Sequence, residues 1–112
     1  IVLALMASGL NGQSFTFHGY LPIDSQERVR AIRELEKVSR TSGATQIFIE
    51  TPYRNQKLFE EVLKTCQPGT MLCIARDLTG VSEFIKTATI STWRNQTVDL
   101  NKIPSVFLLL AR

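Results

Sequence analysis

The sequence predicts an α/β domain of three layers, in which helices flank a mixed sheet of mostly five strands. Mainly apolar runs of strand length occur at residues 46–49, 71–75 and 103–111, and near-continuous runs of this kind are typical of buried strands. A helical pattern of apolar residues separates the first two runs, formed by Leu58, Phe59, Val62, Leu63 and Cys66. Helices that alternate with buried strands in one short chain indicate layers packed around a shared core.

Composition further limits the class of protein and the kinds of site that the chain can have. The chain has 112 residues, 44% of them hydrophobic, which suits one folded domain, residues 1–112, with a core of its own. A net charge of +3 permits a polyanionic partner without requiring one. The two cysteines, Cys66 and Cys73, have no metal-ligand spacing. We therefore expect buried thiols in a reducing compartment and no metal site.

The first residue is Ile1 rather than Met, and residues 1–7 form an apolar helical run that Ser8 and Gly9 stop. We interpret this start as part of a longer protein, with a further domain upstream. A signal-peptide core is the alternative, but no basic flank precedes the run and it is too short to span a bilayer.

The next two elements are a strand and a helix. Residues 14–21 alternate, with Phe15 and Phe17 on one side and Thr16, His18 and Tyr20 on the other, which predicts a strand with one apolar face. Asp24, three residues before Glu27, resembles a capping box. A helix is expected from there to about Ser42, stopped by Gly43, with its inward residues at Val29, Ile32, Leu35 and Val38.

The second half repeats this alternation. The strand at 46–49 leads into a helix closed by Pro68 and Gly69, and the strand at 71–75 follows. Residues 84–90 alternate as a half-exposed strand does, and residues 91–93 suit one short helical turn. The run 103–111 predicts a last strand covered on both faces.

The stretch from Glu50 to Arg54 is the first candidate site. A carboxylate, a hydroxyl, a proline, an aromatic ring and a guanidinium follow one another between a buried strand and a helix. Such a junction lies at the carboxyl edge of a sheet, where open α/β sheets bind ligands. Glu50 and Arg54 have two readings: they pair with each other to hold the turn, or they face a ligand.

Other candidate groups support simpler interpretations. Arg30, Arg33, Lys37 and Arg40 form a basic stripe on one helix face, but glutamates on the same helix favour a solvated face over a phosphate site. His18 is the single histidine and is expected to be a half-buried strand residue rather than a base. All glycines are isolated, so the sequence has neither a Walker loop nor a dinucleotide fingerprint.

Several short motifs occur together in a specific order. They are Ala7-Ser8-Gly9-Leu10, Phe17-His18-Gly19-Tyr20-Leu21-Pro22, Phe48-Ile49-Glu50-Thr51-Pro52-Tyr53-Arg54, Ala75-Arg76-Asp77-Leu78-Thr79, Glu83-Phe84 and Ile103-Pro104-Ser105. Over essentially the whole chain they resemble the carboxyl-terminal half of the tetrapyrrole-methylase superfamily. Within it they look most like the branch of small-subunit ribosomal RNA cytidine 2′-O-methyltransferases.

The resemblance implies an enzyme of two α/β domains with S-adenosylmethionine in the cleft between them. This chain would supply cofactor contacts at Thr51, Thr87, Ala88, Pro104 and Ser105. The resemblance also implies a ribosomal RNA substrate, a homodimer, a cytoplasmic location and no membrane contact.

On the substrate side, methyl transfer to a ribose hydroxyl requires an aligned acceptor and the removal of its proton. Glu50 and Arg54 are the expected catalytic groups, and Tyr53 and Arg76 the expected substrate-binding groups.

The chain departs from the family pattern at four places. Tyr53 occupies the position of a usual histidine, and Gly80 that of a usual lysine. Residues 23–26 replace a basic cluster, and Thr87-Ala88 replaces a glycine–threonine pair. These changes remove positive charge from the substrate side, so the resemblance supports methyl-donor binding more directly than an RNA acceptor.

Three hypotheses therefore remain open at the level of sequence. The chain belongs to an RNA 2′-O-methyltransferase, to a methylase of the same fold that acts on a small molecule such as a tetrapyrrole, or to a non-catalytic α/β module that binds RNA or protein. A steep salt dependence of binding would distinguish the first from the second.

Overall fold

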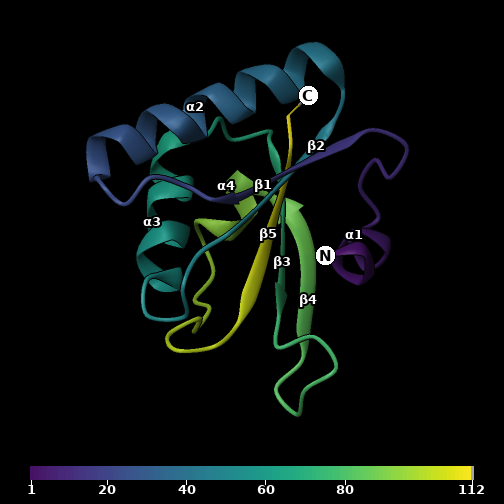
Figure 1. Ribbon diagram of the computed structural model, residues 1–112, viewed down its shortest axis with the longest axis vertical. Helices are drawn as coiled ribbons and strands as arrows, with labels where there is room; N and C mark the ends of the chain where they lie inside the picture. The colour runs from purple at the N-terminus through teal and green to yellow at the C-terminus, as the bar shows by residue number, and fades with distance from the viewer. Residues whose placement is uncertain (112) are drawn as a thin grey trace.

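The computed structural model describes residues 1–111 and has the predicted order of helices and strands (Figure 1). The elements are α1 (Val2–Ser8), β1 (Phe15–Tyr20), α2 (Ser25–Ser42), β2 (Thr45–Ile49), α3 (Asn55–Thr65), β3 (Met71–Arg76), β4 (Phe84–Thr89), α4 (Ile90–Trp93) and β5 (Ser105–Leu110). The predicted α/β class is confirmed, as is the short helical turn after β4.

The five strands form one mixed sheet in the order β1-β2-β5-β3-β4. β1 and β2 are parallel, whereas β5 is antiparallel to both β2 and β3, and β4 is antiparallel to β3. The carboxyl ends of β1, β2 and β3 therefore meet the amino ends of β4 and β5 at one edge of the sheet. We call this the carboxyl edge; it carries the segments 20–23, 50–54, 76–83 and 103–105.

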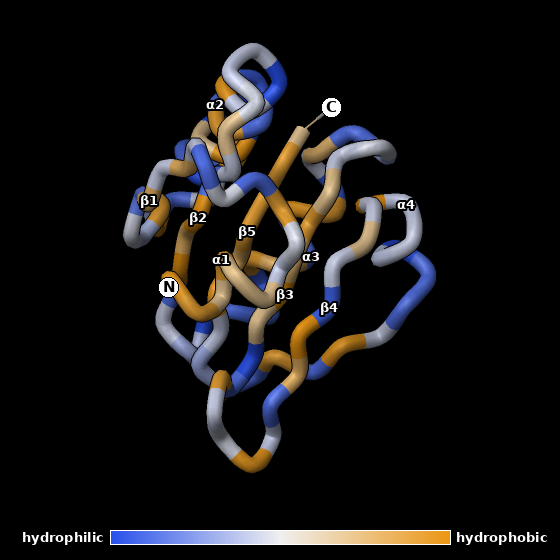
Figure 2. The backbone as a smooth tube through the Cα atoms, turned by 90° about the vertical axis from the view of Figure 1, so that its right-hand side faces the viewer, coloured by the Kyte–Doolittle hydropathy of each residue, from blue (hydrophilic) through white to orange (hydrophobic). Residues whose placement is uncertain are grey.

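Helices cover the sheet unequally, which gives the three layers. α2, α3 and α4 pack on one face, where the main core includes Ile32, Leu58, Trp93 and the stacked rings of Phe48 and Phe107. The other face holds a smaller core and a single helix, α1. Its buried residues are Ala4, Leu5, Ile47, Cys73, Ala75 and Leu108. Figure 2 views the sheet from the side of α1.

α2 begins and ends as the sequence predicts, but its buried face differs. Asp24 accepts a hydrogen bond from the backbone N–H of Glu27 at 3.0 Å, and Gly43 ends the helix at φ 74°, a conformation that suits glycine. Ile32 and Leu35 are buried as expected, whereas Val38 is exposed. Arg28, Glu36 and Ser39 are buried instead, because each finds polar partners beneath the helix.

β1 forms as predicted, but it is an exposed edge strand rather than one with a buried apolar face. Phe15 and Phe17 are each 44% exposed. The register shifts after Phe17, where Gly19 adopts φ 68°, and Tyr20 pairs with Ile49. This shift turns Tyr20 to the side of Phe17, so the predicted grouping of Tyr20 with Thr16 and His18 is wrong. His18 is exposed rather than half-buried, and its Nε2 lies 2.6 Å from Gln46 Oε1.

The remaining strands match their patterns. Phe107, Leu108 and Leu109 of β5 are fully buried, as a strand covered on both faces requires, and every residue of β4 is partly exposed. Both cysteines are buried free thiols. Within residues 1–111, none of the helices is apolar and long enough to cross a membrane.

Candidate functional site

A cleft of about 490 Å³ opens at the carboxyl edge, on the face of the sheet that carries α1. It is lined by Tyr20, Ile49, Glu50, Pro52, Ala75, Asp77, Leu78, Pro104, Ser105 and Val106. These residues come from the ends of β1, β2 and β3 and from the start of β5, so the sheet topology alone brings them together. The walls are mainly apolar with a few polar groups, which is the usual composition of a small-molecule site.

Hydrogen bonds hold the segment 50–54 against the loop before β5. The backbone N–H of Lys102 donates to Pro52 O at 2.9 Å, and Asn55 Nδ2 donates to Ile103 O at 2.6 Å. Within the segment, the N–H of Arg54 donates to Thr51 O at 2.9 Å. Two stretches that lie about fifty residues apart in the chain therefore form adjoining walls of the cleft.

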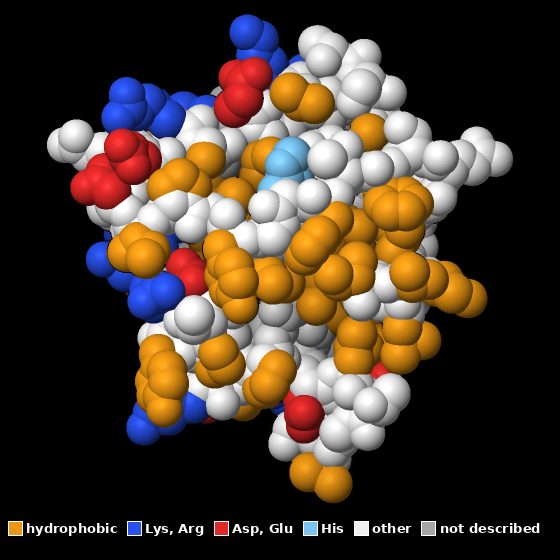
Figure 3. Space-filling model, viewed as in Figure 1, with side chains coloured by type: hydrophobic (Ala, Val, Ile, Leu, Met, Phe, Trp, Pro, Cys, Tyr) orange, Lys and Arg blue, Asp and Glu red, His pale blue; other side chains and the backbone are white. Residues whose placement is uncertain are grey.

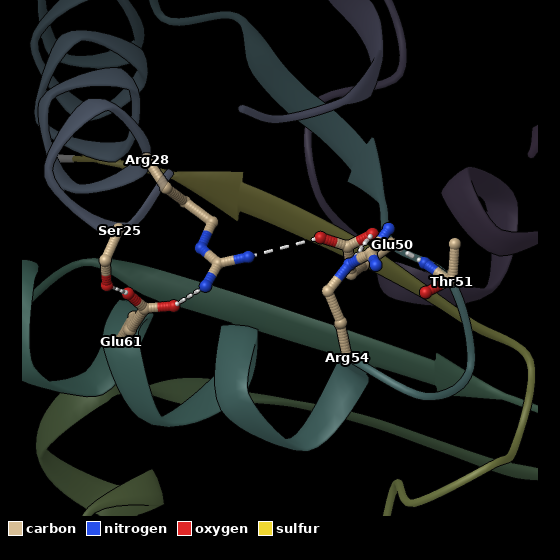
Figure 4. Close-up of polar contacts among 6 residues, drawn as sticks. All are labelled: Ser25, Arg28, Glu50, Thr51, Arg54 and Glu61. Carbon is tan, nitrogen blue, oxygen red and sulfur yellow. Dashed lines mark hydrogen bonds and ion pairs between the residues drawn. The ribbon is translucent and has the colours of Figure 1, made fainter. Parts of the chain in front are cut away.

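A buried cluster of charged side chains lies behind this wall (Figure 4). The guanidinium of Arg28, from α2, lies between Glu50 and Glu61, with Nη1 3.3 Å from Glu50 Oε2 and Nη2 2.5 Å from Glu61 Oε1. The Arg28 and Glu50 side chains are each only 1% exposed. Ser25 Oγ completes the cluster by donating to Glu61 Oε2 at 2.8 Å. Removing one partner of such a group leaves an uncompensated buried charge, which costs about 3–5 kcal/mol.

Glu50 uses both carboxylate oxygens within this arrangement. Oε2 faces Arg28, while Oε1 accepts the N–H of Thr51 at 2.7 Å and lies 3.3 Å from Nε of Arg54. Arg54 differs from Glu50 in burial, because its side chain is 38% exposed. Glu50 therefore holds the turn, as the structural reading expects. Arg54 reaches the surface, and its role toward a ligand stays a prediction.

The structure brings two of the five predicted cofactor-binding residues to the cleft. Pro104 and Ser105 line it, whereas Thr51, between Glu50 and Pro52 in the chain, lines a neighbouring cavity. Tyr53 is 77% exposed beside them.

Thr87 and Ala88 lie elsewhere. They pair with Cys73 and Leu72, toward the middle of the sheet rather than at its carboxyl edge. Thr87 Oγ1 donates to Ser8 O at 2.7 Å, and Ala88 packs on the main core. The structure does not bring these two residues to the cleft, and their cofactor role stays a prediction.

Arg76, the other predicted substrate-binding residue, is held by its own domain. Its Nη1 donates to Asp99 O at 2.9 Å and its Nε to Ser82 O at 3.3 Å. The guanidinium also lies 5.2 Å from the ring centre of Phe84. These contacts tie the end of β3 to the loop before β4 and to the loop before β5, and the substrate role of Arg76 stays a prediction.

Sequence reasoning missed three residues of this region. Arg28 lies four residues before Ile32 and seven before Leu35, so helical spacing alone would have placed it on the inward face. Asp77 was visible within a family-like motif but received no role. Tyr20 was assigned to the opposite side of β1, because nothing in the alternation shows the shift at Gly19. Within residues 1–111, no group of three or more His, Cys, Asp or Glu side chains is arranged to hold a metal ion.

No family model matches the chain, but individual proteins do. A protein of Vibrio cholerae named ribosomal RNA small subunit methyltransferase I is 36% identical over 96 residues, which cover 83% of this chain and 32% of that protein. The protein of the same name from Halalkalibacterium halodurans is 35% identical over 76% of the chain and 28% of its own length. The one from Xylella fastidiosa is 26% identical over 100% of the chain and 40% of its length.

The fold has a solved counterpart as well. The crystal structure of the methyltransferase CobJ superposes with a TM-score of 0.60 and 18% sequence identity, covering 99% of this chain and 47% of that one. At this identity the likeness concerns the fold alone. The chain spans between 28% and 40% of the length of the curated relatives that it matches. Over the segment that it spans, this chain belongs to the ribosomal RNA small subunit methyltransferase I family.

Proposed function

We propose that this chain is the carboxyl-terminal part of an S-adenosylmethionine-dependent methyltransferase that acts on small-subunit ribosomal RNA. The observation that carries this proposal is the family membership itself, since the curated relatives all bear the name of that activity. The cleft at the carboxyl edge supports it, because it lies where open α/β sheets bind ligands. Because the chain spans about a third of the length of its relatives, the proposed activity is that of the full-length protein.

The cleft fits the proposed cofactor. Ile49, Leu78 and Val106 offer apolar walls for an adenine ring. Asp77 places a carboxylate at the cleft, where it suits the positive charge of a sulfonium. The hydroxyl oxygen of Thr51 is buried and has no hydrogen-bond partner within residues 1–111. Bound here, S-adenosylmethionine would supply an activated methyl group. Pro104 and Ser105 in the cleft, and Thr51 in the adjoining cavity, are the residues proposed to hold it.

The other wall of the cleft is proposed to come from an upstream domain of the same protein. The α1 side of the sheet supports this, since it exposes Ile1, Val2, Leu3, Met6, Phe15 and Phe17, each at least 44%. Figure 3, in the orientation of Figure 1, shows apolar side chains gathered around the region of β1 and α1. Large exposed apolar patches mark contact surfaces. The resemblance to the family adds a homodimer and a cytoplasmic location to the proposal.

The substrate side is proposed to lie at Tyr53 and Arg54, with Glu50 behind them. Arg54 carries a permanent positive charge suited to a phosphate, and Tyr53 is exposed next to it. A small-molecule acceptor is the second candidate, because Tyr53 and Gly80 replace the histidine and lysine that family members usually have.

Methyl transfer to RNA gives the direct test. The full-length protein is incubated with S-adenosylmethionine labelled in the methyl group and with small ribosomal subunits or their naked RNA. We expect labelled RNA, and titration calorimetry is expected to show cofactor binding. Cofactor binding without labelled RNA, together with binding that does not weaken as salt rises, would favour the small-molecule acceptor. Absence of cofactor binding would leave only a non-catalytic module.

A further inference from the structure

A second cavity, of about 410 Å³, adjoins the cleft at the carboxyl edge. Its walls are Tyr20, Leu21, Pro22, Ile23, Glu50, Thr51 and Arg54; we call it the Tyr20 pocket. Tyr20 and Glu50 line both cavities, so the two are contiguous. The Tyr20 pocket combines apolar walls with one guanidinium, which is a different chemistry from that of the cleft.

Arg54 is aimed into this pocket by the residues behind it. Its Nε lies 3.3 Å from Glu50 Oε1, and Glu50 is itself held by Arg28 and by the N–H of Thr51. Within residues 1–111, Nε of Arg54 makes no hydrogen bond, and neither terminal nitrogen donates one to the protein. The guanidinium is therefore held beside Glu50 by charge attraction, and its outer edge is available to an anion.

Two exposed aromatic rings are close to that guanidinium in the pocket or in the chain: Tyr20 lines the same pocket, and Tyr53 immediately precedes Arg54. Tyr20 is 63% exposed and Tyr53 is 77% exposed. An accessible tyrosine and an arginine in one pocket are a combination by which proteins bind single-stranded RNA, since a base stacks on the ring and the phosphate pairs with the guanidinium. A tetrapyrrole or a peptide would explain the apolar walls but not the pairing of an exposed ring with a guanidinium in one pocket.

We propose that the Tyr20 pocket binds one nucleotide of an RNA strand, with the base against Tyr20 and its phosphate on Arg54, and that Glu50 is the positioning residue that aims Arg54. This inference rests on the proposed RNA methyltransferase function. Because the pocket shares two walls with the cleft, a nucleotide held here delivers the neighbouring ribose to the methyl donor. Glu50 acts through Arg54, since both of its oxygens are engaged within the protein.

The test uses the full-length protein and a fluorescein-labelled, single-stranded RNA of mixed sequence. Fluorescence anisotropy measures its dissociation constant at several salt concentrations for wild type and for Arg54→Gln, Tyr20→Leu, Tyr20→Phe and Glu50→Gln. Lys64→Gln is the matched charge control: Lys64 is exposed and lies about 15 Å further along α3 than Arg54 at 1.5 Å per residue. Calorimetry with S-adenosylmethionine and thermal unfolding show whether each variant is folded.

Each variant has its own expected result. Arg54→Gln weakens RNA binding and makes the slope of log affinity against log salt shallower by about 0.7, the value for one phosphate contact. Tyr20→Leu weakens binding about tenfold with the slope unchanged, and Tyr20→Phe restores it. Lys64→Gln leaves affinity near that of wild type.

For Glu50→Gln, the direction of the change in RNA affinity distinguishes the two possible roles of Glu50. The substitution removes a negative charge near the RNA, so a purely electrostatic role predicts tighter binding, whereas a positioning role predicts weaker binding. Tighter binding by a folded Glu50→Gln would overturn the positioning role.

Two results separate failure of this inference from failure of the proposed function. If wild type methylates RNA while Tyr20→Leu and Arg54→Gln bind RNA as well as Lys64→Gln does, the Tyr20 pocket is not a nucleotide site and the inference is overturned. If wild type neither binds nor methylates RNA, the proposed function itself fails, and the inference fails with it.

Discussion

The thiol of Cys66 shows how its surroundings alter one side chain. The pKa of this thiol is raised from its ordinary value of 9.0 to about 12, mainly by burial and next by the nearby carboxylate of Glu36. Burial also raises the pKa of Cys73. Neither thiolate forms near neutral pH, so neither cysteine is suited to act as a nucleophile.

This shift makes stability depend on pH in the alkaline range. The folded state keeps the Cys66 proton to a higher pH than the unfolded state, so the stabilisation is complete below about pH 9 and is lost as pH rises toward 12. We expect the free energy of unfolding of the full-length protein to fall less steeply with pH in Cys66→Ala than in wild type, by at most about 1.4 kcal/mol per pH unit. Denaturant titrations between about pH 8.5 and 10.5 measure this difference. Parallel curves would contradict the assignment.

Arg54 and Arg28 both contact the carboxylate of Glu50, but Arg28 is buried and Arg54 is partly exposed. Their substitutions are therefore expected to differ in their effects on stability and activity. Arg54→Ala should lower methyl transfer by the full-length protein while changing the free energy of unfolding by no more than about 1 kcal/mol, because half-exposed ion pairs contribute little. Arg28→Ala should destabilise by about 3–5 kcal/mol, since it leaves buried carboxylates unpaired. Turnover assays and denaturant unfolding measure the two effects. Equal destabilisation by both would show that Arg54 is purely structural.

The edge strand β1 owes its unusual end to Gly19. At φ 68° this residue has a backbone conformation that costs an L-amino acid about 1–2 kcal/mol. A Cβ at this position would meet nothing within 4 Å, so conformational strain is the single penalty. The register shift that Gly19 permits turns Tyr20 toward the cleft, and this strand therefore supplies a wall of both cavities.

Gly19→Ala tests this account of β1. It should destabilise the full-length protein by about 1–2 kcal/mol and should weaken RNA binding as well, because the strained residue adjoins Tyr20. Gly12→Ala is the matched control, since Gly12 also has open space around its Cα but no positive φ. Thermal unfolding and RNA anisotropy measure both variants. Equal effects of the two substitutions would count against a special role for Gly19.

The two faces of the sheet differ in how completely this chain covers them. α2, α3 and α4 cover one face, whereas the other has one helix of 7 residues. Phe17 and Thr16 are neighbours on β1 that point to opposite faces. If an upstream domain or a second copy covers the α1 side, Phe17→Asp should lower the melting temperature of the full-length protein by several degrees more than Thr16→Asp. Light scattering then shows whether the dimer or the fold is affected, and similar melting temperatures would show that this face stays open.

Helix and strand positions followed from the sequence because they depend on local periodicity. The cap at Asp24, the stop at Gly43 and the buried run of β5 all lie where residue type and spacing predict them. The exposure of Val38 and the burial of Arg28 did not follow, because an arginine enters a core only when carboxylates from other elements meet it. Those partners, Glu50 and Glu61, lie 22 and 33 residues further along the chain.

In the candidate site, too, some features could be predicted from the sequence and others depended on the fold. From the sequence alone came the α/β class, the stretch from Glu50 to Arg54 at a strand end, and its proximity to Pro104, because strand ends and family-like motifs are local signals. Three features depended on the fold: the strand order that makes one edge from five strands, the register shift that turns Tyr20 toward the cleft, and the separation of Thr87 and Ala88 from the cleft. Strand pairing and buried charge pairing are set by contacts between distant residues, and no local pattern of residues encodes which distant partners will meet.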